Sequence, residues 1–153
     1  MPGDRRRRYG SVAMTPEQIE LVESTFGSLD MEAVAADFYF RAFNADTQLS
    51  AMFTTDPATQ RTRFAKELGV IVKSIRHFED FRTETRDLGR RHRGYGVRAG
   101  HYRVMGDALL AALEAALGDR WNDDVAEAWR LAYNMTSESM LDGAGPSLSD
   151  QPH

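Results

Sequence analysis

Hydrophobic residues recur along this chain at intervals of three and four, the spacing that places them on one face of an α-helix. The most regular series follows the polar segment TTDPATQ and runs from Gln60 to Ile75 in steps of four, four, three and four residues. The strict alternation of apolar and polar residues that is typical of β-strands hardly occurs. The pattern therefore predicts an all-α protein.

About six substantial helices and one short helix are predicted from these series and from the residues that start and stop helices. Residues Thr15–Gln18 match a capping box, Asp30 can cap a second helix, and Asp46 or Thr47 can cap a short third one. The segment RGYG, with its two glycines, ends the helix that precedes it. The series with helical spacing are Ile19, Val22 and Phe26; Val34, Phe38 and Phe43; Gln60, Phe64, Leu68, Ile71 and Ile75; Phe81, Thr85, Leu88 and His92; Tyr102, Met105, Leu109 and Leu113; and Val125, Trp129, Ala132, Thr136 and Met140.

The length of 153 residues suits one domain with a single core. No repeat of fixed period occurs, which disfavours a solenoid, and the number and uneven lengths of the helices disfavour a four-helix bundle. We expect a disordered arginine-rich tail at residues 1–14, a folded domain at residues 15–142 and a flexible tail rich in glycine, proline and serine at residues 143–153.

Charge and hydropathy exclude several classes of partner. The net charge of -4 argues against a general affinity for nucleic acids or anionic membranes. The longest apolar stretch, Ala108–Leu117, is too short to span a membrane, and no apolar segment typical of a secretory signal follows the arginine run Arg5–Arg8. We therefore expect a cytoplasmic protein without a membrane span, in which Arg5–Arg8 is either a solvated tail or an arm that binds a partner.

Candidate chemistry is limited by the absence of cysteine, so any metal must be held by histidine, methionine, tyrosine, aspartate or glutamate. The motifs GxSxG, GxGxxG and GxxxxGK are also absent. His92 and His101 lie nine residues apart across a predicted turn, which does not suit a zinc site. His92, in the segment LGRRHRGYGV, remains as a lone histidine on an apolar helix face, either a hydrogen-bonded core residue or a ligand.

Five further segments, taken in order, favour the ligand role for His92. They are DFYFRAF, LSAMF, TQRTRF, LGRRHRGYGVRAGHY and EAWRLAY. They resemble the second helix, the aromatic corner, the distal helix, the proximal segment and the last helix of a globin, specifically of the flavohemoglobin-like class of bacterial globin domains. The resemblance covers the chain from Thr15 to about Leu141. It implies a globin fold around a heme pocket, with heme b as the cofactor.

The resemblance implies that His92 binds the heme iron through one ring nitrogen, while the other donates to a backbone carbonyl or a nearby polar group. Phe53 would wedge against the macrocycle, and Phe64 would close the distal pocket. Tyr39 and Gln60 would project into that pocket and donate hydrogen bonds to a bound gas. Simpler roles stay open at this point. Phe53 could only pack in the core, Tyr39 could be a half-exposed helix residue, and Gln60 could point to solvent.

Other expected contacts with the heme are less specific. Arg63 and Arg91 would each lie at the rim, where a guanidinium can pair with a propionate, or would simply be solvated. Leu88 shares the face of the proximal histidine, and Val97 is placed to pack against the macrocycle. Tyr102 matches a tyrosine that the class commonly places near that histidine.

The class usually completes this proximal network with a glutamate from the last helix, but no glutamate occurs at residues 142–144. Glu138 and Asp142 are the available substitutes, and His77 and His101 are expected at the surface. The first functional hypothesis is a globin that reversibly binds dioxygen and other diatomic gases, such as nitric oxide or carbon monoxide, for storage, delivery or scavenging.

Two alternatives remain. A nitric oxide dioxygenase of this class takes electrons from a flavin domain, and because this chain stops at His153 we expect it to need a separate reductase for that activity. A gas or redox sensor module would instead act through a protein partner, with Arg5–Arg8 as the contact.

Overall fold

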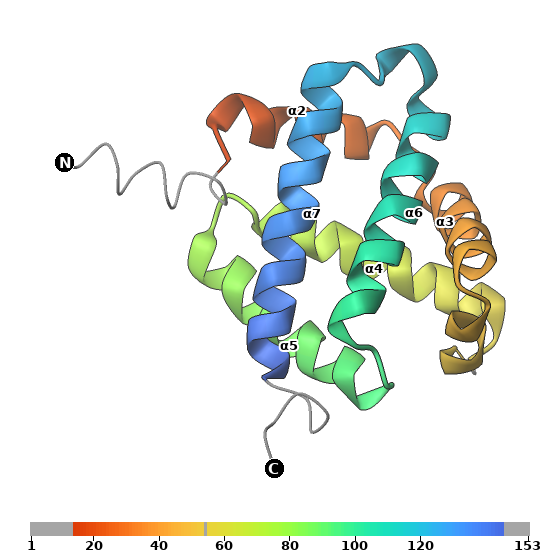
Figure 1. Cartoon of the computed structure of the whole chain (residues 1–153). Coiled ribbons are helices and arrows are strands. Elements are labelled where there is room, and N and C mark those ends of the chain that lie inside the picture. Colours follow the sequence, from red (N-terminus) through yellow and green to blue (C-terminus); the bar gives the residue numbers. More distant parts are fainter. Residues whose placement is uncertain (1–13, 54, 146–153) are drawn as a thin grey trace.

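The computed structural model describes residues 14–53 and 55–145, and these residues form helices without any strand. This confirms the all-α prediction, with six α-helices, the short helix η1 and one further short turn, η2. The last helix ends at Ala144, two residues beyond the boundary expected at 142. Most of the predicted tails, including Arg5–Arg8, lies outside the described residues. The elements are α2 (Pro16–Gly27), α3 (Met31–Ala45), η1 (Thr47–Met52), α4 (Pro57–Ser74), α5 (Phe78–Gly94), α6 (Ala99–Leu117), η2 (Gly118–Arg120) and α7 (Asp123–Ala144) (Figure 1).

The helices begin where local side chains can satisfy their first free backbone N–H groups. Thr15 and Gln18 form the expected capping box at the start of α2, with each side chain accepting a hydrogen bond from the other residue's backbone N–H. Asp30 caps α3, and Asp46, rather than its neighbour Thr47, caps η1. Asp56, just before the proline that opens α4, caps that helix.

The core takes buried residues from every α-helix, α2 to α7, while α4 runs behind α6 and α7 in the view of Figure 1. Trp129 of α7 is almost fully buried and donates its ring N–H to Thr25 of α2 at 2.9 Å. Leu49 of η1 and Leu113 of α6 are fully buried as well. This packing fixes α3, α4, α5 and α6 around the space that contains the candidate site. None of the described helices is both long and apolar enough to cross a lipid bilayer.

Helix α5, which carries His92, lies in unusually close contact with α7. A side chain on Gly89 would overlap the backbone carbonyl of Met140, and one on Gly143 would overlap the backbone of Arg86. The glycines therefore allow the two helix backbones to touch. Polar groups join the same two helices along their length: Thr85 with Ser139, Arg86 with Asp142, and Arg93 with the backbone carbonyl of Ala144.

Candidate functional site

A cavity lined mainly by α3, α4 and α5 brings together nine of the ten residues predicted for the site. Its volume is roughly 140 Å³, and it opens to solvent at one side. Sequence analysis missed several of its wall residues. The predicted residues in the wall are Tyr39, Phe53, Gln60, Arg63, Phe64, Leu88, Arg91, His92 and Val97, and the others are Phe38, Met52, Thr55, Glu67, Tyr95 and Met105.

A second cavity of roughly 110 Å³ continues from the first into the core and shares the His92 wall with it. Its lining is largely apolar and comes from α4, α5, α6 and α7, with Phe38 of α3. Tyr102, the tenth predicted residue, lies here and not at the mouth of the first cavity. Together the two cavities form a space with a polar mouth and an apolar interior.

His92 lies in the last turn of α5 and contributes to the walls of both cavities. Its Nδ1 is 2.9 Å from the backbone carbonyl oxygen of Leu88, one turn earlier, so the proton on this nitrogen donates to the carbonyl. Burial lowers the pKa of His92 and favours the neutral imidazole, the form that binds metal ions. The arrangement leaves Nε2 as the ring nitrogen that can bind a ligand.

Tyr39 and Gln60 form a polar pair within the first cavity. The side-chain amide of Gln60 donates a hydrogen bond to the hydroxyl oxygen of Tyr39 at 3.2 Å, so this glutamine does not point to solvent. Because the tyrosine oxygen accepts here, its own hydrogen remains available for another acceptor. Burial raises the pKa of Tyr39 to about 12, which keeps the hydroxyl protonated near neutral pH. The cavity therefore presents a hydrogen-bond donor.

Aromatic rings hold the Tyr39 side chain in place. Phe53 and Phe64 each meet its ring edge to face, with ring centroids 5.5 and 5.7 Å away, and Phe64 also stacks on Phe38 at 4.5 Å. Such contacts add about 0.5–1.5 kcal/mol per pair beyond the burial of apolar area. Phe53 thus lies in the cavity wall and packs against Tyr39, and its expected contact with the macrocycle stays a prediction.

Charged residues surround the mouth of the first cavity. Arg63 is exposed and has no ion pair among the described residues. Arg91 pairs with Glu67 across α4 and α5 at 3.0 Å, and with Asp87 on its own helix at 3.4 Å. Arg91 is therefore not simply solvated, and Glu67 is a wall residue that bridges the two helices beside His92.

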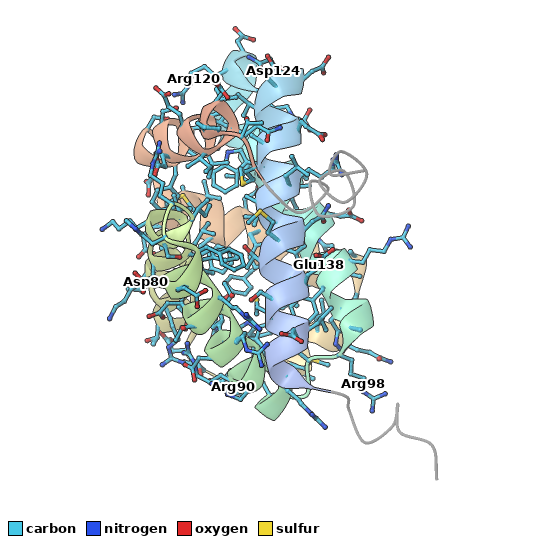
Figure 2. The ribbon with its side chains drawn as sticks, turned by 90° about the vertical axis from the view of Figure 1, so that its left-hand side faces the viewer. Asp80, Arg90, Arg98, Arg120, Asp124 and Glu138 are labelled. Carbon is cyan, nitrogen blue, oxygen red and sulfur yellow. The ribbon has the colours of Figure 1, made fainter. Side chains whose placement is uncertain are left out.

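The carboxylates of α7 do not reach His92. Glu138 lies on the exposed surface of α7 (Figure 2), and Asp142 forms an ion pair with Arg86. Within the described residues the only hydrogen bond of the His92 imidazole is therefore to the Leu88 carbonyl. Neither of these two carboxylates, considered as substitutes for a proximal glutamate, therefore forms a hydrogen bond to His92.

The other two histidines in the described residues lie away from the cavity. His77 is exposed, as expected, and His101 is half-buried, with its Nδ1 accepting from the backbone N–H of Arg98.

These residues fit a heme better than a bare metal ion. No group of three or more histidine, aspartate or glutamate side chains in residues 14–53 and 55–145 could hold a metal ion alone. Heme brings four nitrogen ligands of its own, so one neutral imidazole is enough for the protein to provide. Its apolar ring matches the interior of the cavities, and its two carboxylates match the cationic mouth. The fold and the cavity together define a heme-pocket protein of the all-α class.

Comparison with known proteins identifies the family. The sequence profile of the globin family matches residues 35–140, so the chain belongs to the globin family. Among curated relatives, a flavohemoprotein of Bacillus subtilis is 28% identical over 128 residues, which is 80% of this chain and 32% of the relative. A flavohemoprotein of Deinococcus radiodurans is 30% identical over 135 residues, or 84% and 33%. The chain spans about a third of the length of these relatives.

Solved structures confirm the fold. A bacterial globin from Campylobacter jejuni superposes with a TM-score of 0.77 at 24% identity, covering 85% of this chain and 96% of the other. A hexacoordinated heme protein from an anhydrobiotic tardigrade superposes with a TM-score of 0.76 at 15% identity, covering 86% and 95%. At these identities the similarity concerns the fold alone, and it agrees with the globin fold predicted from the sequence.

Proposed function

We propose that this globin binds heme b through His92 and reversibly binds dioxygen and other diatomic gases. The observation that supports this most directly is the state of His92: its Nδ1 donates to the Leu88 carbonyl, its pKa is lowered by burial, and it lines a cavity with a polar mouth. The hydrogen bond fixes the orientation of the ring, as it does for histidine ligands in general. Heme would supply an iron atom with an open position for a gas.

Tyr39 and Gln60 would determine how long a gas stays bound. The Gln60 amide occupies the acceptor side of the Tyr39 hydroxyl, which leaves the hydroxyl proton to donate to a gas molecule in the cavity. Donors held in a water-poor cavity favour a ligand that carries partial negative charge. This pair therefore favours dioxygen over carbon monoxide, which accepts hydrogen bonds poorly, and slows the release of dioxygen.

Arg63 and Arg91 would hold the two propionates at the mouth. Arg63 has no ion pair in the described structure, whereas Arg91 would have to share its guanidinium with Glu67 or exchange that carboxylate for a propionate. The apolar lining around Leu88 and Val97 would contact the ring of the heme, since both side chains are buried in the cavity wall. These roles follow from chemistry and position at the mouth and in the wall.

A nitric oxide dioxygenase that works with a separate reductase is the second candidate, favoured by the similarity to flavohemoproteins. The proximal side favours gas binding instead, because a carboxylate partner would make His92 more electron-donating and its partner here is a backbone carbonyl. The sensor hypothesis stays a prediction, since Arg5–Arg8 lies outside the described residues. The cytoplasmic location likewise stays a prediction.

The experiment is a heme titration of the purified chain followed by absorption spectroscopy. We expect a Soret band that saturates at one heme per chain, and dioxygen and carbon monoxide should each shift it reversibly in the reduced protein. His92→Ala should lose the band, and added imidazole should restore much of it. The matched control is His77→Ala, an exposed histidine at the start of the same helix. A chain that takes up no heme, or an unchanged spectrum in His92→Ala, would refute the proposal.

A further inference from the structure

The positive charge of the chain is concentrated beside the candidate site. Residues 86–103 contain six arginines and one aspartate, a formal charge of +5, in a protein whose net charge is -4. This segment comprises the end of α5, the turn that follows it and the start of α6. Cations near a helix C-terminus stabilise the helix, which accounts for arginines in the last turn of α5 but not for those beyond it.

Only half of these arginines are neutralised by carboxylates. Asp142 pairs with Arg86, and Asp87 and Glu67 pair with Arg90 and Arg91. The other three have no ion pair within the described part of the chain, although one of them donates to the Ala144 carbonyl. These three are Arg93, Arg98 and Arg103. Figure 2 shows that Arg90 and Arg98 lie toward the end of the molecule where α5 and α7 end, whereas Arg120 and Asp124 lie at the opposite end.

An exposed aromatic residue lies within this basic segment. Tyr95 follows the last turn of α5, is 56% exposed and also lines the mouth of the first cavity. The centroid of its ring is 6.1 Å from that of His92. Its neighbours Gly94 and Gly96 carry no side chains and are exposed, so another surface can approach the ring closely. Tyrosine and arginine are among the residues most enriched where protein interfaces gain their binding energy.

We propose that Tyr95 and the surrounding arginines, Arg90, Arg93, Arg98 and Arg103, form a docking surface for an acidic flavoprotein that delivers electrons to the site. This inference rests on the proposed function, because dioxygen binding needs ferrous iron. In each encounter the donor loses one electron and ferric iron becomes ferrous, with no bond formed or broken. The surface suits this partner because it adjoins His92 and because small, charge-guided contacts are typical of electron-transfer encounters.

An acidic protein fits this surface better than a nucleic acid does. The rest of the chain carries an excess of negative charge, which would repel a long polyanion beyond the basic patch. A compact partner with a local acidic face avoids that repulsion. Complementary charge also accelerates encounter, by between about 10-fold and 1000-fold at low ionic strength.

The binding test uses flavodoxin, a small acidic flavoprotein, as the probe and the full chain with heme bound. Nuclear magnetic resonance titration should give a dissociation constant that rises at least about tenfold between low and physiological salt. Arg98→Glu should weaken binding by about tenfold, and Tyr95→Ala should weaken it as well. Arg120→Glu, the same change of charge at the opposite end, is the matched control and should leave binding unchanged.

The kinetic test is stopped-flow reduction of the ferric protein by flavodoxin hydroquinone without oxygen. The second-order rate constant should fall with salt and with Arg98→Glu but not with Arg120→Glu. Equal effects of Arg98→Glu and Arg120→Glu, no salt dependence, or equal binding to single-stranded DNA or anionic vesicles would overturn the docking proposal. The Soret band and the dioxygen affinity of each variant are recorded separately, so a failure of heme binding is distinguished from a failure of docking. If no heme is bound, the titration of the apoprotein still tests the surface.

Discussion

Replacing Tyr39 by phenylalanine removes one hydroxyl group from the cavity wall and tests the distal half of the proposed site. That hydroxyl accepts from the Gln60 amide at 3.2 Å, so its own hydrogen is available for a gas molecule. A hydrogen bond to a charged group contributes about 1.5–3 kcal/mol. Because about 1.4 kcal/mol corresponds to a factor of ten, we expect Tyr39→Phe to release dioxygen roughly 10 to 150 times faster.

The response of Gln60 determines where in this range the increase in the dioxygen release rate falls. Without the tyrosine oxygen, its amide loses its partner and can turn to donate to the gas instead, which would restore part of the lost stabilisation. We therefore expect the single variant to lie in the lower part of the range. The double variant Tyr39→Phe with Gln60→Leu should release dioxygen faster than the two single effects predict if each residue compensates for the loss of the other.

The assay mixes the dioxygen complex with excess carbon monoxide and follows the exchange by absorbance. Tyr133→Phe is the matched control, because it removes a hydroxyl from another partly buried tyrosine, whose hydrogen bond goes to the backbone carbonyl of Tyr102. Its release rate should change little. If Tyr39→Phe retains its Soret band and releases dioxygen at the original rate, the hydroxyl does not contact the gas and the distal assignment is wrong.

Two further predictions concern packing and pH. Gly89→Ala should lower the free energy of unfolding by about 1–3 kcal/mol in urea denaturation, because the new methyl group would overlap the Met140 carbonyl. Gly94→Ala, whose methyl group would meet open space, should change it by less than about 0.5 kcal/mol, and equal effects would refute the close contact. Burial raises the pKa of Tyr39 to about 12, so the protonated form is favoured in the folded state and its contribution to stability is lost as the pH rises through that value. Dioxygen release should therefore stay constant through pH 10, the ordinary tyrosine pKa, and accelerate only as the pH approaches about 12. The same pH dependence of dioxygen release in Tyr39→Phe would refute the assignment of this dependence to Tyr39.

The fold was predictable because its signals are local. Helical spacing and capping side chains depend on residues three or four apart, and they identified the six α-helices and the short helix η1. The placement of His92 on the face of Leu88 was predictable for the same reason. Chain spacing alone could not show that Tyr39 and Gln60 meet, since they belong to different helices. That expectation came from the resemblance to globins, and the hydrogen bond between the two side chains agrees with it.

The remaining features depend on contacts between helices that the sequence does not encode locally. In the sequence, Gly89 is an ordinary glycine in a polar helix, and only the packing of α7 against it shows why a larger residue does not fit. Glu67 lies three residues after Phe64 and so shares its helix face. Its charge nevertheless suggests a surface residue, so the sequence did not identify it as part of the cavity wall. The position of Tyr95 depends on how the chain leaves α5, which no periodicity reveals. The pairing of Asp142 with Arg86 likewise required the structure.

The close contact between α5 and α7 has a consequence for protein synthesis. Helix α5 is rich in charged residues and has few apolar ones, so it gains most of its stability by packing on other helices. The partner it touches most closely, α7, is translated last among the described helices. We therefore expect His92 to leave the ribosome well before it acquires its final position, and heme capture to follow the emergence of α7. Ribosome-bound chains that stop before Asp123 should accordingly retain heme poorly.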